Sequence, residues 1–304
     1  MSNRHIIYIP GKNPKPVPEQ HQELLWKVLL EGVRRADINI ASTLQNHSAQ
    51  FHLVNWNYLF YHAFKDITPD IPWIDAIINK HGPSELDIRE AKSWRNRLGR
   101  FLFNLADHVP ILIPLLPEEV DSAATEMNRY FTNENNIAYE IRNLLKQTLR
   151  PLIKKHEPVL LIGHSLGSVI AYDTLWELTH LEELHGKVDF LTIGSPLGMH
   201  YVRRRLLGMN NNGNTSYPSH NSYPGLIKHW INLSSEGDII ALERNFHDVF
   251  EEMLKQKLVT SIEDHSHGIY NYFRNEEGLN CHRSYGYLVN PAVGNVIANW
   301  WKNN

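Results

Sequence analysis

Cysteine is almost absent from this chain of 304 residues, which contains only Cys281. A single thiol can form neither a disulfide framework nor a thiolate metal cluster, and it suits a reducing compartment. Long apolar runs are also missing, because the best candidate, VPILIPLLP at 109–117, is far shorter than the ~18 residues of a membrane helix. The opening MSNRHIIYIPGK lacks the apolar core of a secretory signal. We therefore expect a soluble, cytoplasmic protein with no transmembrane segment.

Neither sign of charge dominates the sequence. Thirty Lys and Arg residues face 33 Asp and Glu residues, so the formal net charge is -3 and nucleic acid is not expected as a partner. No G-x-x-x-x-G-K-[ST] or G-x-G-x-x-G follows a strand-like run, which argues against the usual phosphate-binding loops. Hydrophobic residues make up 42% of the chain, enough for the core of one α/β domain spanning 1–304.

The most informative stretch is PVLLIGHSLGSVIA at 158–171. An apolar run from Val159 to Ile162 meets G-H-S-L-G at 163–167, and a helical pattern follows at once. A strand, a sharp turn with Ser165 at its tip and a helix form the context of a nucleophile elbow. Such a turn needs strained backbone at the serine, and its glycines allow strand and helix to pass closely. The alternative is a purely structural strand-to-helix turn.

The rest of the chain alternates between strand and helix patterns. Strands are predicted at His5–Ile9, Phe51–Trp56, Val188–Ile193, Leu226–Leu233 and 259–264, and helices at 19–46, 132–155, 168–179, 241–254 and 291–301. Strand, helix, strand implies parallel pairs with right-handed crossovers. The predicted fold class is therefore α/β, with a mostly parallel sheet flanked by helices.

Residues 57–131 do not continue this alternation. Ser84 and Asp87 have the spacing of a capping box, and an apolar stripe from Ala91 to Leu105 follows before the run at 109–117. We interpret 57–131 as a helical cap inserted over the sheet edge, which would exclude water from an apolar acyl substrate. The alternative is that the stripe belongs to the core.

A serine hydroxyl needs a base to take its proton and a carboxylate to orient that base. On sheets with this elbow the partners follow in the order Ser, Asp or Glu, His, each in a loop after a strand. The strand ending at Leu233 leads into SSEGD, where Asp238 follows a glycine and Glu236 is the second choice. Asp238 could instead cap a helix or hold a turn.

The base is harder to choose, because the chain has 18 histidines. Only His247, His265, His267 and His282 follow Asp238. His247 falls within an amphipathic helix pattern, whereas His282 lies in a polar loop before the closing helix, so we favour His282 over His267 and His265. The H-x-H at 265–267 would place two imidazoles on one strand face, but no third ligand is evident and no metal site is predicted.

An oxyanion formed at the serine needs backbone amides as donors. Leu166, the residue after the nucleophile, supplies one. The first strand ends in a Gly- and Pro-containing loop, PGKNPKP, so the amides of Gly11 and Lys12, or of Asn13, are candidates for the other. An ordinary polar loop is the alternative. Ser195 also ends a strand, but a turn serine beside proline is more typical of structure than of catalysis.

Four blocks resemble lipase- and esterase-type bacterial members of the α/β-hydrolase superfamily. They are GHSLGSVIAYD at 163–173, LTIGSPLG at 191–198, WINLSSEGDIIAL at 230–242 and CHRSYGYLVNPAV at 281–293. The resemblance covers roughly 140–301 and the first strand with its loop, and it implies Ser165 as nucleophile, Asp238 as acid and His282 as base. The first strand departs from the family pattern, since it ends in Pro-Gly rather than His-Gly. The acid block reads Asp-Ile-Ile instead of Asp-Pro-Val.

The sequence thus predicts a serine hydrolase that cleaves carboxylic esters through an acyl-enzyme. We expect a small-molecule ester with an apolar acyl group as the substrate, and the mechanism requires no cofactor. Two alternatives stay open. The same triad could serve an acyltransferase or a thioesterase, or the chain could be an inactive binding module of hydrolase fold.

Overall fold

The computed structural model describes residues 3–93, 118–210 and 220–304. At its centre is a six-stranded sheet in the order β2-β1-β3-β4-β5-β6, in which every neighbouring pair is parallel. The strands are β1 His5–Ile9, β2 Phe51–Leu53, β3 Val159–His164, β4 Val188–Ile193, β5 Ile227–Leu233 and β6 Ser261–His265. A separate two-stranded hairpin pairs β7 Arg274–Asn275 with β8 Gly278–Leu279. The predicted α/β architecture is confirmed.

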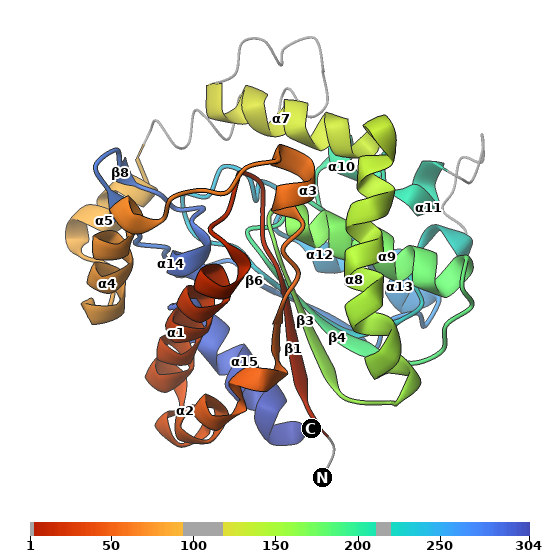
Figure 1. Cartoon of the computed structure of the whole chain (residues 1–304), viewed down its shortest axis with the longest axis horizontal. Coiled ribbons are helices and arrows are strands. Elements are labelled where there is room, and N and C mark those ends of the chain that lie inside the picture. The colour runs from red at the N-terminus through yellow and green to blue at the C-terminus, as the bar shows by residue number, and fades with distance from the viewer. Residues whose placement is uncertain (1–2, 94–117, 211–219) are drawn as a thin grey trace.

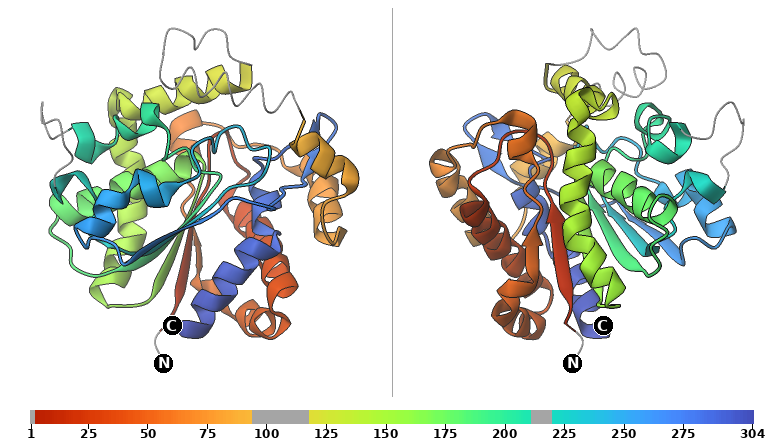
Figure 2. Two further views of the ribbon diagram at one scale, coloured as in Figure 1. Left: turned by 180° about the vertical axis from the view of Figure 1, so that it is seen from behind. Right: turned by 45° about the vertical axis from the view of Figure 1, so that its right-hand side comes forward.

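Helices cover both faces of the large sheet (Figures 1 and 2). On one face lie α1 Pro18–Ala36, α2 Ile38–Leu44 and α15 Pro291–Asn303, and on the other lie α8 Ile137–Lys154, α9 Leu166–His180, α12 Phe246–Val249 and α13 Glu251–Lys255. None of the helices in the described ranges is both long and apolar enough to cross a membrane.

Alternate residues of β1 point into two different cores. Ile6 and Tyr8 pack with the buried side chains of α1 and α15, whereas Ile7 and Ile9 pack with those of α8 and α9. All five residues of β1 are buried, because a parallel sheet with helices on both faces leaves neither face to water. This is why the strands read as continuous apolar runs in the sequence.

Two predicted helices have different bounds in the structure. The single helix predicted at 19–46 is wrong, because the backbone is extended at Asp37 (φ −150°), where α1 ends. The Asp37 carboxylate accepts from the amides of Asn39 and Ile40 and so caps α2. The helix predicted at 241–254 is also wrong in extent, since α12 begins only at Phe246 and is separate from α13.

The region 57–131 contributes several short helices and one longer one. These are α3 Asn57–Tyr61, α4 Ile71–Asn79, α5 Glu85–Ala91 and α7 Glu118–Phe131. The Ser84–Asp87 capping box is confirmed at the start of α5. The predicted stripe from Trp94 onward and the run at 109–117 lie outside the described residues. In Figure 1, α7 crosses the end of the sheet opposite both termini, which is the carboxyl end of the parallel strands.

Candidate active site

Ser165 is the single residue between the end of β3 and the start of α9. Its backbone has φ 53° and ψ −128°, a strained conformation for a residue with a side chain. The turn is held by a hydrogen bond of 3.2 Å from its amide to Ile193 O on β4. A serine at a helix N-cap usually accepts from an amide of the first turn, but the Ser165 hydroxyl makes no such bond. The hydroxyl is therefore left available for other chemistry.

Two glycines of the elbow permit close backbone contacts of different kinds. A Cβ on Gly163 would lie 2.6 Å from Ser168 Cα, so this glycine brings strand and helix together. A Cβ on Gly167 would lie 2.3 Å from Ile9 O and 2.6 Å from Pro10 O. Gly167 therefore allows α9 to pack closely against the end of β1, the neighbouring strand. Any side chain at this position would clash with the β1 backbone and displace the helix from the sheet.

Asp238 and His282 meet at the carboxyl end of the sheet. His282 Nδ1 lies 2.8 Å from Asp238 Oδ2, which also accepts from the Tyr287 hydroxyl at 2.6 Å. The other carboxylate oxygen accepts from the amides of Ile240 at 2.9 Å and Ala241 at 3.3 Å. Asp238 is 0% exposed, and this burial raises its pKa, but His282 and the hydrogen bonds outweigh burial and hold the pKa at about 2. The carboxylate is ionised at neutral pH.

These contacts define the tautomers of two histidines. An ionised carboxylate only accepts, so His282 donates its Nδ1 proton to Asp238, and in the neutral ring Nε2 is the nitrogen that carries the lone pair. His164 Nε2 lies 2.9 Å from the carbonyl oxygen of His282, which also can only accept, so the His164 proton sits on Nε2. Burial, and then the neighbouring His282, lower the pKa of His164 well below its ordinary value. His164 thus holds the backbone of His282 as a neutral donor.

Ser165 and His282 line the same two cavities. The larger has a volume of about 390 Å³, and the smaller has about 20 Å³ and is also bordered by Met127 of α7 and Leu166. Among the described residues, no hydrogen bond joins the Ser165 hydroxyl to His282. Hydrogen bonds between catalytic side chains are often long in the absence of substrate and shorten when it binds. The proximity of Ser165 and His282 is therefore inferred from the two cavities that both residues line.

The loop after β1 passes directly over Ser165. A Cβ on Gly11 would lie 2.8 Å from Ser165 Cβ. Side-chain donors occupy the loop's carbonyls, because Trp56 Nε1 donates to Pro10 O at 2.8 Å and Asn57 Nδ2 donates to Gly11 O at 2.8 Å. Neither of these hydrogen bonds was predicted from the sequence, although Trp56 and Asn57 lie only three and four residues after the end of β2, the strand next to β1.

Two of the candidate oxyanion donors differ in availability. Leu166 is the first residue of α9, so its amide has no partner within the helix and lies beside Ser165. The Asn13 amide donates to the Tyr61 hydroxyl at 2.9 Å and is thereby engaged. Gly11 and Lys12 stay predicted loop donors, and Gly11 is packed against Ser165.

The structure does not bring the other predicted candidates to Ser165. Glu236 lies 3.8 Å from Arg244 rather than beside His282. His247, His265 and His267 are exposed, and within the described ranges no three His, Cys, Asp or Glu side chains form a group that could hold a metal. The Ser195 hydroxyl is buried, 2.7 Å from that of Ser168, and accepts from the Leu197 amide, a structural role.

Tyr287 is the member of this cluster that the sequence reasoning missed. It lies on α14 Ser284–Leu288, the short helix that follows His282, and its ring is fully buried. Its hydroxyl accepts from the Ser235 amide at 2.9 Å while donating to Asp238. The available signal was the pair of tyrosines, Tyr285 and Tyr287, that follows His282. Side chains of a helix that begins just after a loop can pack back against that loop.

Comparison of the chain with protein-family models, with curated proteins and with solved structures finds no match. The chemistry of the site is therefore argued from the geometry of its own residues.

Proposed function

We propose that this chain is a serine hydrolase of carboxylic esters with an α/β-hydrolase type of site. Ser165 is the nucleophile, His282 the general base and Asp238 the group that orients the base. The observation that carries the proposal is the buried Asp238–His282 hydrogen bond of 2.8 Å at a cavity shared with a strained, uncapped serine. The order of these three residues along the chain is the one found with this type of elbow.

The first half-reaction transfers the acyl group to the enzyme. Ser165 Oγ attacks the ester carbonyl carbon while its proton passes to His282 Nε2, and Asp238 stabilises the resulting imidazolium. The negative carbonyl oxygen accepts from the amide of Leu166 and from that of Gly11 or Lys12. The intermediate then collapses, the bond to the alkoxy oxygen breaks, and His282 returns its proton to the departing alcohol.

Water completes the cycle. It gives a proton to His282 as it attacks the acyl-enzyme, the Ser165 ester bond breaks, and the serine recovers its proton from His282. The products are a carboxylic acid and an alcohol. In this proposal α7 forms part of a cap, since Glu126 and Met127 border the smaller cavity together with Ser165.

The decisive experiment is labelling with a fluorophosphonate probe followed by intact-mass measurement. We expect one adduct on the natural chain, none on Ser165→Ala, and a loss of about 10⁴ in kcat for that variant because the nucleophile is removed. Ser42→Ala, at an exposed position of α2, is the matched control and should label normally. A natural chain that folds but takes up no probe would favour the inactive binding module.

A further inference from the structure

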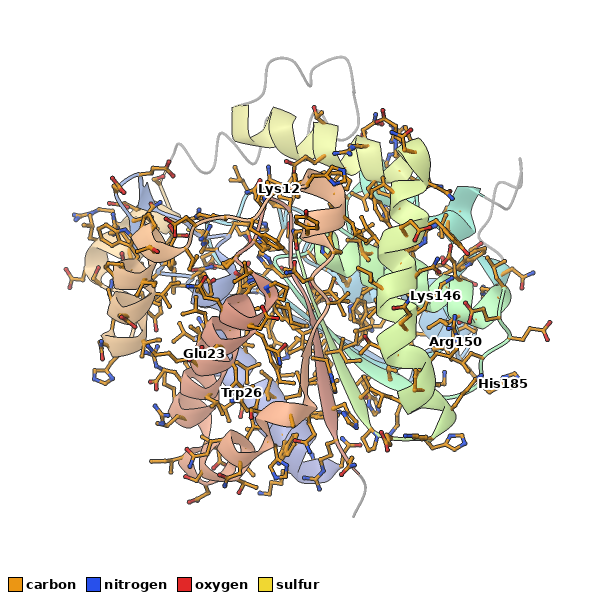
Figure 3. All side chains as sticks on the ribbon, in the orientation of Figure 1. Lys12, Glu23, Trp26, Lys146, Arg150 and His185 are labelled. Atoms are coloured by element: carbon orange, nitrogen blue, oxygen red, sulfur yellow. The ribbon has the colours of Figure 1, made fainter. Side chains whose placement is uncertain are left out.

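The larger cavity beside Ser165 is lined by side chains of one charge sign. Four lysine or arginine residues and three histidines border it, and none of the described lining residues is Asp or Glu. The charged and titratable lining residues are Lys12, Lys15, Lys65, Arg283, His21, His164 and His282. They come from the loop after β1, from α1, from the segment after α3, from the end of β3 and from the loop before α14. Figure 3 shows Lys12 at this end of the sheet, beneath α7.

Carboxylates behind the lining compensate only part of this charge. Asp70 is shared, because both Lys65, at 2.6 Å, and Arg283 pair with its Oδ2 atom. Lys12 lies 3.8 Å from Glu126. Lys15 has no carboxylate within ion-pair distance in the described part of the chain, and its ammonium donates to Lys12 O at 2.6 Å. Asp238 does not line the cavity and is already bonded to His282.

Three buried nitrogen atoms at this cavity have no hydrogen-bond partner among the described residues. They are Arg283 Nε, His164 Nδ1 and His21 Nδ1, the last on a residue that is only 2% exposed. Buried polar atoms are normally satisfied, and Arg283 Nε marks a place where an acceptor from a ligand would restore a missing bond. A histidine Nδ1 instead accepts when the ring proton is on Nε2, as it is in His164. A guanidinium Nε–H can only donate, and its fork matches carboxylate and phosphate oxygens.

We propose that the ester substrate carries a second, anionic group, a carboxylate or a phosphate, which binds in this cavity against Lys15 and Arg283. This inference rests on the proposed function, because it names the substrate class of the same site. A volume of about 390 Å³ lies in the usual range for small-molecule ligands. By contrast, the smaller cavity, bordered by Met127 and Leu166, has about 20 Å³, room for no more than about one water. Of these two cavities, only the larger therefore has room for a substrate group beyond the reacting ester, and its charged lining favours an anionic one.

The electrostatics of the cavity agree with this assignment. Burial lowers the pKa of Lys15 to about 7, and the cations of Arg283 and Lys65 add to that effect. An anion placed among these groups would offset both causes and favour the charged form of Lys15. Lys65 and Lys15 are also held side by side, since the Lys65 amide donates to Lys15 O at 2.9 Å.

The first test uses ester pairs that differ only in charge. One pair is mono-p-nitrophenyl glutarate and its neutral methyl ester, with the charge on the acyl side, and the other is 4-acetoxybenzoate and its methyl ester, with the charge on the leaving group. Rates are normalised to alkaline hydrolysis of each compound. We expect kcat/KM to be at least about tenfold higher for the charged member of one pair. Equal values within both pairs, in an enzyme that cleaves them all, would overturn the inference and leave the proposed function standing.

Variants of Lys15 then test whether this residue causes the preference for charged esters. Lys15→Met should reduce the charged-to-neutral ratio towards 1, and Lys15→Arg should restore most of it. Lys27→Met is the control, because Lys27 is exposed on α1, pairs with Asp75 and does not line the cavity. An unchanged ratio in Lys15→Met would contradict the assignment.

The second test does not depend on catalysis. Calorimetric titration of the natural chain with inorganic phosphate and with glutarate should show one site for at least one of them, weakened at least about tenfold by Lys15→Met. The two titrations distinguish a phosphate from a carboxylate site. If neither anion binds, the inference is overturned even if Ser165 reacts with the fluorophosphonate probe. If an anion binds but Ser165 is not labelled, the proposed hydrolase function is rejected and the anion site remains.

Discussion

The hydroxyl group of Tyr287 lies 2.6 Å from Asp238 Oδ2, the same oxygen that accepts the proton of His282. Because the Tyr287 ring is buried on α14, the helix that begins just after the His282 loop, this contact ties the two loops together. The carboxylate thus has a fixed orientation before any substrate arrives.

Asp238→Asn should remove the orientation of His282 without removing its ring. An amide can donate as well as accept, so the wrong tautomer of His282 becomes available and kcat should fall by about 10⁴. The stability difference between the natural chain and the variant should also depend on pH. The pKa of Asp238 is about 2 in the folded protein, below its ordinary value of 3.8. This difference adds about 2 kcal/mol to the free energy of unfolding. The contribution is fully present above pH ~4 and is lost as the pH falls through about 2.

Urea unfolding of both proteins between pH 5 and pH 2 measures this pH-dependent part. The free energies of unfolding should approach each other as the pH falls. A difference that stays constant over this range would show that the Asp238 charge is not stabilised by the fold.

His282→Ala should reduce ester hydrolysis about as much as Ser165→Ala, since a triad member acts only with the others. His267→Ala is the matched control, because His267 is exposed and its ring contacts Ser266 rather than the site. Its kcat/KM should equal that of the natural chain. If His267→Ala were the damaging change, the base would be misassigned.

Gly194→Ala should damage the site through both strain and contact. Gly194 has φ +56°, and an added Cβ would lie 3.0 Å from Asp238 Oδ2 and 3.1 Å from His282 Nδ1. Gly268→Ala is the control, since Gly268 has φ +71° with no atom within 4 Å of its added Cβ. Both variants should lose about 1 kcal/mol of stability from the left-handed backbone. Of the two variants, only Gly194→Ala should lower kcat. Equal kcat values for Gly194→Ala and Gly268→Ala would contradict this prediction, because they would mean that displacing the Asp238–His282 pair does not affect activity.

Glu177→Ala should test the packing of α8 on α9 without touching the site. Glu177 pairs with Arg142 at 2.9 Å and Lys146 at 2.6 Å, and all three residues are buried. Figure 3 labels Lys146 on α8. Removing the Glu177 carboxylate takes a buried counter-charge away from both Arg142 and Lys146. The free energy of unfolding should therefore fall by about 3–5 kcal/mol. Glu251→Ala, in an exposed pair with Lys255, should cost well under about 1 kcal/mol in the same denaturant series.

Local pattern sufficed for the elements that define the sheet. The strands at His5–Ile9 and Val188–Ile193 and the turn at Ser165 follow from apolar runs bounded by glycine and proline, signals that lie within a few residues of each other. The helix prediction at 19–46 failed for a local reason as well. Asp37 offers a side-chain cap inside an otherwise continuous apolar pattern, and the cap allows a new helix to begin.

By itself, the sequence determined the α/β alternation, the elbow and the order in which an acid and a histidine follow Ser165. Only the tertiary structure decided that His282 meets Asp238 while His267 stays exposed, and that Tyr287 joins the pair. It also decided that lysine and arginine side chains from separate loops line one cavity. The physical reason is that periodicity and capping act over one or two turns of chain. Which loops converge depends instead on the crossovers and register of six parallel strands, a property of the whole packed sheet.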